Sequence, residues 1–494
     1  MKLLLSFIGV FLSCSLFAQI NGFVQGNNGK KTEALYGVKI KLLKSKKGVV
    51  TNEEGIFELV LPKSLPDTMV ISARGYFSDT IIVDKKDRFL ALNVVLYSEQ
   101  LLPEVIVEYK RKSFSISRLK VLHVEELSSS ELKKAACCNL GESFETNASV
   151  DVNMTDAVSG AKKIQMMGLE GIYTQIQFEN IPYLRGLESS FGLETIPGSW
   201  IESIQITKGA GNVVNGNESM AGLINLELEK PETMDRFFMN AYQNRFGRSE
   251  LNFRSGLSLS KKWSAGIFGY ISSQWGEVDE NGDSFMDIPL GSNLSALGRF
   301  DYEGEKMEAK LGFNIHEDVK NGGQMSSINN PYGVQINNTH FDLFTKTGFF
   351  GKKPAQSLGI ITNWKYQLID GNFGNRFFAG EEKRGYVNII YDDFIKTSDH
   401  KIKTGLSFTY DHYDEFVNAD AYERTENSVG VFGEYSYDNL DKLTLTAGVR
   451  ADQHNRFGFF VTPRLHLRYT PWEKSAIRLS AGRGIRSANI FAEN

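Results

Sequence analysis

The chain has 494 residues, of which 41% are hydrophobic and 12% aromatic, so it is long enough for several domains with apolar cores. Its formal net charge is only −4, which argues against a nucleic-acid partner because binding phosphates needs a basic surface. Its three cysteines are Cys14, Cys137 and Cys138, which cannot form a disulfide framework.

Residues 1–18 are expected to be a secretory signal peptide. Lys2 is followed by an apolar run over residues 3–17, and Ala18 precedes a suitable cleavage point. The alternative is a membrane anchor, but the run is short for a span and no stop-transfer segment follows it. Because no later stretch has about 18 consecutive apolar residues, a membrane role would require a β-barrel.

Residues 20–97 contain short strand-like runs separated by glycine, proline and lysine. Such spacing is typical of a small β-sandwich. In "GVVTNEEGIFELVLP", residues 52–55 are expected to form a turn between two strands. The segment resembles a carboxypeptidase-regulatory-like domain of exported proteins. It has no zinc-ligand set, so we interpret it as an accessory module and not a peptidase.

Residues 103–108, "PEVIVE", form an isolated extended stretch between two folded regions. The region after it, residues 112–231, begins with a segment in which Leu132, Ala136 and Leu140 share one helix face. Short strands with many glycine and asparagine turns follow. This region is therefore expected to be an α/β domain.

The end of that region alternates like two strands around a break. Residues 201–208 and 223–228 read as strands, and residues 209–217 read as a tight turn because glycine and asparagine tolerate positive φ. Pro231 ends the pairing, since proline cannot donate to a strand ladder.

Residues 235–494 show a sustained period of two. In residues 443–451, Thr444, Thr446 and Arg450 alternate with apolar residues, and the same pattern recurs in residues 402–409 and 464–469. Runs of about ten such residues are typical of transmembrane strands with one lipid face and one polar lumen face. We therefore expect an antiparallel transmembrane β-barrel.

The connections between these runs alternate in length, as they do in outer-membrane barrels. A soluble sandwich or propeller is the alternative, but it has no reason to keep every second connection long. The short connections are residues 260–262, 303–306, 352–356, 397–400, 438–442 and 471–475, and the long ones are 275–293, 316–340, 370–382 and 415–427. We count about thirteen strands, an odd number for a bacterial barrel, and expect a C-terminally truncated chain.

The stretch "IESIQITKGAGNVVNGNESMAGLINLELEKP" resembles the end of the plug domain in TonB-dependent outer-membrane receptors. "ESFETNASVDV", "GAKKIQMMGLEG" and "IQFENIPYLRGLE" fit the same plug in order. Two places depart from the family pattern. Met167-Gly168 stands where Arg-Gly is usual, and Glu179-Asn180 stands where Asp-Gly is common, which makes a glycan substrate less expected.

The resemblance implies a mainly β protein with an N-terminal β-sandwich, an α/β plug and a barrel of 22 strands, of which about 13 are present. It would lie in the Gram-negative outer membrane, in contact with lipid, with the plug side and the N-terminal domain toward the periplasm. Periplasmic TonB, driven by the inner-membrane proton gradient, would pull on the plug. It would grip an extended segment by strand addition, here Glu104, Val105, Ile106, Val107 and Glu108. A plain linker or a last sandwich strand is the alternative.

The implied function is active import of a metal complex, most directly a ferric siderophore. Copper, haem or cobalamin import, or a surface adhesin or scaffold without transport, are the alternatives. A passive porin is disfavoured by the plug and by residues 103–108. Outward plug loops are implied at residues 153–162, 169–173 and 183–193. The substrate-binding candidates in them are Tyr173, Tyr183, Arg185 and Phe191, since aromatic and guanidinium groups suit an anionic metal chelate. The alternative is that these aromatics pack the plug against the barrel wall.

Two further sets of side chains have the composition of metal ligands. Thiols and thioethers select Cu(I), and Cys137, Cys138, Met154, Met166, Met167 and Met220 supply them, although core packing is the simpler role. A structural calcium is possible at Asp279, Asn281, Asp283 and Asp287, whose spacing resembles a calcium loop but lacks its glycine and final glutamate; a solvated acidic loop is the alternative. No catalytic motif is present, so neither an enzyme nor a cofactor is expected.

Overall fold

The structure is a computed structural model that divides into two compact units, residues 1–108 with 394–400 and residues 109–393 with 401–494. The predicted signal peptide (1–18), the predicted TonB-contact segment (103–108), Cys137 and Cys138 lie outside the described residues. Within the described residues, no helix combines the length and apolar character needed to cross a membrane. The described residues are 19–27, 31–62, 64–84, 91–98, 114–116, 124–128, 132, 140–144, 147–156, 158–351, 353, 356–395, 397, 399–439, 442–472 and 475–489.

The N-terminal unit is the predicted β-sandwich. One sheet pairs β1 with β2, β5 and, in parallel, β8; the other has the order β4-β3-β6-β7. Apolar side chains from both sheets form one buried cluster that includes Ile20, Ile40 and Phe57. The predicted turn is present, because Gly55 has a φ of 76° and Ile56 N–H donates to Asn52 Oδ1 at 2.8 Å. The strands are β1 (Gln19–Asn27), β2 (Thr32–Ala34), β3 (Lys39–Leu42), β4 (Gly48–Val50), β5 (Ile56–Val60), β6 (Asp67–Ser72), β7 (Asp79–Val83) and β8 (Ala91–Tyr97).

The second unit begins with a plug domain of two small sheets. A six-stranded sheet has the order β15-β14-β17-β16-β10-β9, and a three-stranded sheet has the order β11-β12-β13. Of the predicted helical segment, only Leu132 and α2 (Leu140–Ser143) are described, and both leucines are buried. The strands are β9 (Phe114–Ile116), β10 (Val124–Ser128), β11 (Val150–Asp156), β12 (Ala161–Met166), β13 (Leu169–Glu170), β14 (Thr174–Phe178), β15 (Ile181–Pro182), β16 (Ile201–Lys208) and β17 (Gly222–Leu228).

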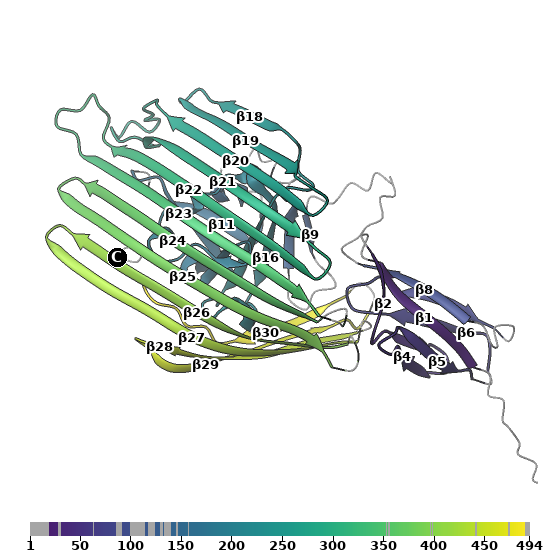
Figure 1. Cartoon of the computed structure of the whole chain (residues 1–494). Coiled ribbons are helices and arrows are strands. Elements are labelled where there is room, and N and C mark those ends of the chain that lie inside the picture. The colour runs from purple at the N-terminus through teal and green to yellow at the C-terminus, as the bar shows by residue number, and fades with distance from the viewer. Residues whose placement is uncertain are drawn as a thin grey trace, which may run out of the picture. The chain divides into compact units, whose positions relative to one another are not determined.

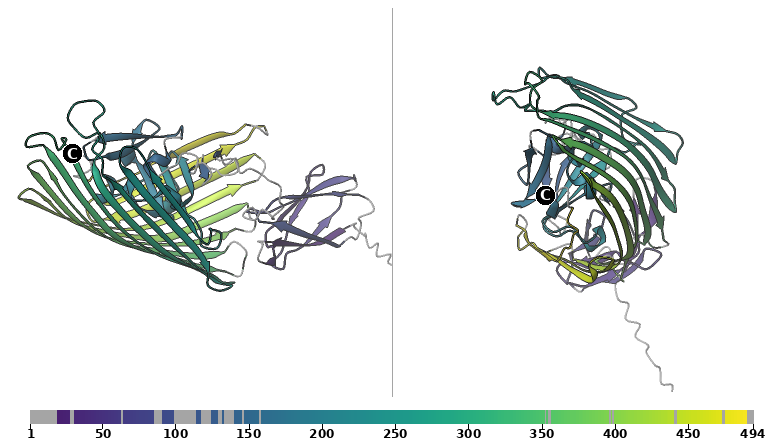
Figure 2. Two further views of the ribbon diagram at one scale, coloured as in Figure 1. Left: turned by 90° about the horizontal axis from the view of Figure 1, so that it is seen from above. Right: turned by 90° about the vertical axis from the view of Figure 1, so that its left-hand side faces the viewer.

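The rest of the unit is one antiparallel sheet of 13 strands in sequence order, with β18 and β30 at its edges (Figure 1). The sheet curves around the plug, so that the plug strands lie on its concave side (Figure 2). Its strands are β18 (Phe238–Gln243), β19 (Arg248–Ser258), β20 (Trp263–Gln274), β21 (Leu290–Glu303), β22 (Met307–Gly323), β23 (Gly333–Phe350), β24 (Ser357–Phe373), β25 (Arg376–Phe394), β26 (His400–Val417), β27 (Asp420–Asp438), β28 (Leu443–His454), β29 (Gly458–Tyr469) and β30 (Ile477–Gly482).

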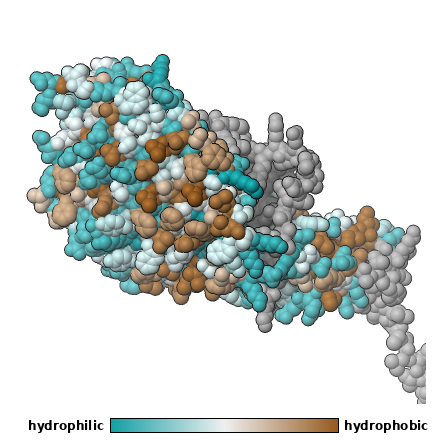
Figure 3. Space-filling view, turned by 45° about the horizontal axis from the view of Figure 1, so that its top comes forward, coloured by the Kyte–Doolittle hydropathy of each residue, from teal (hydrophilic) through white to brown (hydrophobic). Residues whose placement is uncertain are grey.

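The two faces of this sheet differ as the period of two predicted. Thr444, Thr446 and Arg450 are buried on the concave face, whereas Val449 and Leu465 are exposed on the convex face. Figure 3 shows apolar side chains gathered over one side of the sheet. A continuous apolar band on the outside and polar groups inside suit a wall between lipid and an aqueous lumen. The exposed apolar side chains include Ile267, Ile271, Leu294, Phe313, Ile315, Trp364, Leu406, Phe408, Val429 and Val431.

The prediction of a long loop is wrong at two of the four places. Residues 370–382 and 415–427 are strand almost throughout, joined by turns at Gly374 and Asn418, whose φ angles are 61° and 54°. Strands that extend beyond the apolar band into water can carry polar residues on both faces, so their composition resembles that of a loop. The other two are loops only over residues 275–289 and 324–332, because residues 290–293, 316–323 and 333–340 belong to β21, β22 and β23. We call the end of the sheet that carries these two loops the loop end. The opposite end, which carries residues 304–306, is called the turn end.

Candidate functional site

The glycine- and asparagine-rich break between β16 and β17 is longer than the predicted tight turn. Gly209 and Gly216 have φ angles of 80° and 102°, which only glycine adopts without strain. Between them the chain forms a short 3-10 helix, η6 (Val213–Asn215). Val213 and Val214 are buried against Phe432 of the 13-stranded sheet, which we call the wall. The break therefore attaches the plug to the sheet.

Wall side chains also bind the backbone of this break. Arg464 donates from Nη1 to the carbonyls of Gly211 and Asn212, both at 2.8 Å. Asn388 donates to the carbonyl of Val214 at 3.1 Å. Hydrogen bonds from a buried guanidinium satisfy carbonyls that no strand partner reaches, so these residues hold the plug in position.

Glu179 and Asn180 form the turn between β14 and β15, with φ angles of 55° and 65°. The Glu179 carboxylate lies 3.2 Å from Arg299 and 3.1 Å from Lys346, both on the wall. It also accepts the backbone N–H of Leu228 at 2.9 Å. Burial alone would raise the pKa of Glu179, but the Lys346 and Arg299 charges lower that pKa to about 2. The departure from the family pattern thus creates an anchor between plug and wall.

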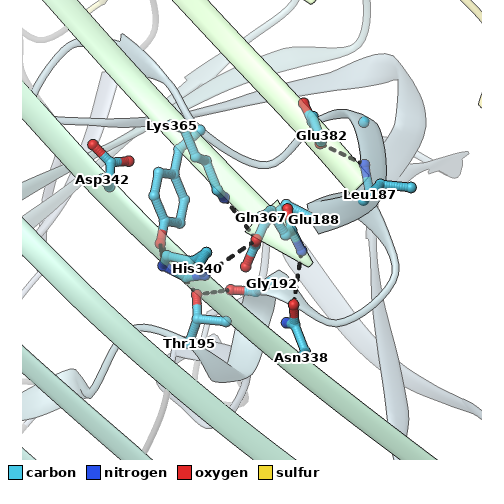
Figure 4. A network of polar contacts seen from close by, with 12 residues as sticks. Leu187, Glu188, Gly192, Thr195, Asn338, His340, Asp342, Lys365, Gln367 and Glu382 are labelled. Atoms are coloured by element: carbon cyan, nitrogen blue, oxygen red, sulfur yellow. Dashed lines mark hydrogen bonds and ion pairs between the residues drawn. The ribbon is translucent and has the colours of Figure 1, made fainter. Parts of the chain in front are cut away.

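A second anchor is the buried pair of Glu188 and Lys365, 2.6 Å apart with both side chains fully buried (Figure 4). His340 Nδ1 lies 3.5 Å from the same carboxylate, and Lys365 Nζ lies 4.7 Å from the Tyr183 ring centroid. Burial would raise the pKa of Glu188, but the Lys365 charge and His340 lower that pKa to about 2. The Glu188 carboxylate, which is buried between plug and wall, is therefore ionised at neutral pH.

A third anchor lies nearer the loop end. Arg185 of the plug donates to Asp411 at 2.8 Å and lies 3.4 Å from Glu218. Arg384 donates to the same aspartate at 3.0 Å and to the backbone carbonyls of Tyr183 and Arg185 at 3.0 and 2.8 Å. Burial disfavours the Arg185 cation, yet the Asp411 and Glu218 charges hold the pKa of Arg185 above its usual value.

A cavity of about 100 Å³ opens on the plug beside this third anchor. Charged side chains of both signs line it, but the basic ones outnumber the acidic ones by four to two. It can therefore receive a polar ligand that carries negative charge. The charged lining residues are Lys162, Lys163, Glu170, Arg185, Glu218 and Arg486.

The four predicted substrate residues lie in different places. Tyr183 and Arg185 line the cavity, and Arg486, which also lines it, lies 5.4 Å from the Tyr173 ring centroid. Tyr183 is nevertheless only 3% exposed, and its hydroxyl lies 3.3 Å from His340 Nε2. Phe191 is 7% exposed and belongs to an apolar cluster with wall residues. Phe191 thus packs against the wall, and Tyr183 packs there while lining the cavity. Arg185 lines the cavity, and Tyr173 is related to it only through Arg486.

The predicted calcium loop uses its carboxylates internally. Asp279 accepts the backbone N–H groups of Gly282 and Ser284 at 2.7 and 3.0 Å, and Asp287 accepts that of Glu280 at 2.7 Å. These hydrogen bonds explain the fold of the loop without a cation, and calcium there stays a prediction. Asn281 and Asp283 hydrogen-bond to each other at 3.1 Å.

The four methionines of the predicted copper set have different surroundings. Met166 is fully buried in the plug core, whereas Met154 and Met167 are 52% and 62% exposed. Met220 lies near Gly484. Met166 thus has the core-packing role that the sequence left open, and copper binding by the set stays a prediction.

Three family models match the chain. One described as "TonB dependent receptor-like, beta-barrel" matches residues 230–493. One described as "TonB-dependent Receptor Plug Domain" matches residues 121–223, and one described as "CarboxypepD_reg-like domain" matches residues 20–107.

Solved structures share the fold at low sequence identity. A variant of the ferric enterobactin receptor PfeA of Pseudomonas aeruginosa has 13% identity and a TM-score of 0.58, over 75% of this chain and 63% of its own. Pyoverdine-bound FpvA of P. aeruginosa has 12% identity and a TM-score of 0.61, over 74% and 57%. The siderophore receptor PirA of Acinetobacter baumannii has 13% identity and a TM-score of 0.58, over 74% and 61%. The chain thus spans about three-fifths of the length of these receptors.

Proposed function

This chain belongs to the TonB-dependent receptor family, and on that premise we propose that it actively imports an anionic metal chelate, namely a ferric siderophore. The family is one of outer-membrane receptors and not of enzymes, and this chain is accordingly an outer-membrane protein of the Gram-negative type. The observation that carries the proposal is the cavity on the plug, whose basic side chains outnumber its acidic ones beside Arg185. Guanidinium and ammonium groups bind carboxylate and catecholate oxygens through charge-assisted hydrogen bonds.

The similar receptors support a siderophore as the substrate. Their descriptions name ferric enterobactin, pyoverdine and siderophores as ligands of those proteins. The plug lies on the concave side of the sheet and is held to it by buried ion pairs, so passage along that side requires that the plug move. We therefore assign the driving force to periplasmic TonB acting on residues 104–108. We also assign the turn end of the sheet and the N-terminal domain to the periplasmic side.

The first test is iron uptake in a strain that lacks the gene. Growth on a ferric siderophore as sole iron source is expected to fail and to return with the full-length gene. A copy in which a glycine-serine segment of equal length replaces residues 104–108 is expected to bind the chelate but not to import it. Unchanged iron uptake in the deletion strain would refute the proposal. A growth defect confined to limitation for copper, haem or cobalamin would identify that compound as the substrate in place of the ferric siderophore.

Arg185→Ala is expected to weaken binding of the ferric chelate by about tenfold or more, since a charge-assisted hydrogen bond contributes about 1.5–3 kcal/mol. Asp411 keeps Arg384 as a partner at 3.0 Å, so the variant should fold. Binding is measured by quenching of tryptophan fluorescence. Arg245→Ala, which removes an arginine with an 80% exposed side chain elsewhere, is the control. Equal affinity of the two variants would show that Arg185 serves only the anchor.

A further inference from the structure

One group of metal-ligating side chains lies outside the plug and its cavity. His412 and Asp414 come from β26 and Glu423 comes from β27, and their ligand atoms all lie within 4.8 Å of one another. On β26, Phe408 and Phe416 at the same alternating positions are 42% and 46% exposed. The group therefore lies on the convex face of the sheet.

The hairpin turn at residues 418–419 sets the pairing of β26 with β27. Counting back from it in an antiparallel hairpin places Asp414 opposite Glu423 and His412 opposite Thr425. Two carboxylates directly opposite each other repel and would destabilise the hairpin. A cation between them would convert this repulsion into attraction.

The orientation of the imidazole suits such a cation. His412 Nε2 faces Asp414 Oδ2 at 3.2 Å, on the side of the carboxylates. His412 Nδ1 lies 2.8 Å from Thr425 Oγ1. When Nδ1–H donates to this hydroxyl, the Nε2 lone pair points to the carboxylates, as it does in histidines that bind metals.

We propose that His412, Asp414 and Glu423 bind one divalent metal ion of the zinc class. An imidazole with two carboxylates is a ligand set for Zn²⁺, whereas Ca²⁺ and Mg²⁺ prefer oxygen ligands alone. Water completes the coordination. Lys383 lies 2.5 Å from Glu381 and is thereby engaged by that carboxylate.

The position of the site gives it a role that does not depend on import. Along β26 and β27 it lies between the exposed apolar residues Phe408 and Val429 and the hairpin turn. The metal ties these two strands together near the loop end. It therefore stabilises the hairpin close to its turn.

The test is a Zn²⁺ titration of the purified chain in detergent, without a polyhistidine tag and with excess Ca²⁺ and Mg²⁺. A chromophoric chelator competes for the zinc and reports affinity. One zinc per chain is expected, and His412→Asn and Glu423→Gln should each abolish it. Thr425→Val should bind about tenfold more weakly, because it removes only the acceptor that orients the imidazole.

Glu317→Gln, which removes an exposed carboxylate elsewhere on the convex face, is the matched control and should bind zinc normally. All four positions face outward, so heat-modifiable migration should show folded protein in each case. Absence of zinc binding, or unchanged binding in His412→Asn, would overturn the site. Unchanged affinity in Thr425→Val would overturn the orientation assigned to the imidazole.

Discussion

Lys365→Met is expected to lower the free energy of unfolding by about 3–5 kcal/mol, because it leaves the fully buried Glu188 carboxylate without its cation. His340 remains at 3.5 Å but is not a permanent charge. The free energy of unfolding is measured by titration with guanidinium chloride in detergent at constant pH, with tryptophan fluorescence as the signal. This pair joins the plug to the wall, so its loss should also loosen the plug.

The double variant Glu188→Gln with Lys365→Met separates the pair from general packing. Replacing both partners of a buried ion pair by neutral groups costs much less than removing one, so the double variant should recover most of the lost stability. Lys383→Met, which removes an exposed lysine that also pairs with a glutamate, should leave the unfolding midpoint unchanged. If Lys365→Met were no less stable than the double variant, the pair would not be the anchor described above.

Acidification is expected to remove the contribution of Glu179. The folded-state pKa of Glu179 is about 2, below the ordinary value of 4.5, so its contribution is fully present above pH 4.5 and is lost as the pH falls toward 2. The difference corresponds to about 3 kcal/mol. The pKa of Glu188 is lowered in the same sense, and the two contributions fall in the same pH window.

Glu179→Gln tests this assignment. The stability difference between this variant and the unsubstituted protein should be largest above pH 5. It should shrink as the pH falls to 2 and below, because the Glu179 carboxyl then becomes protonated in the folded state as well. Glu280→Gln, at a 64% exposed glutamate in a loop, should show no such dependence. A difference for Glu179→Gln that stays constant with pH would mean that shape, and not charge, holds this turn.

Some features were predictable because they are local properties of the backbone. Successive side chains of a strand point to opposite faces, so the alternation around Thr444 and Arg450 predicted which residues are buried on the concave face and which are exposed on the convex face. Likewise, short strands with turns such as Asn52–Gly55 predicted the sandwich. The glycines of the break at residues 209–217 predicted a bend, since positive φ is a property of single residues.

The anchors could not be predicted in this way. Glu179 and Arg299 are 120 residues apart, and Glu188 and Lys365 are 177 residues apart, so their pairing depends on the register of several intervening strands. The sequence does contain a signal, namely a charged residue such as Lys365 at a lumen-facing position between aromatic neighbours. It shows that a buried partner is needed but does not identify it.

The sequence by itself thus determined the sandwich and the two faces of the barrel sheet, because each follows from spacing along the backbone. Only the tertiary structure decided that residues 370–382 and 415–427 are strands and that Tyr183 and Phe191 pack against the wall. It alone placed the cavity beside Arg185 and Glu218. These features depend on which side chains meet across the lumen, and distance along the chain carries no information about that.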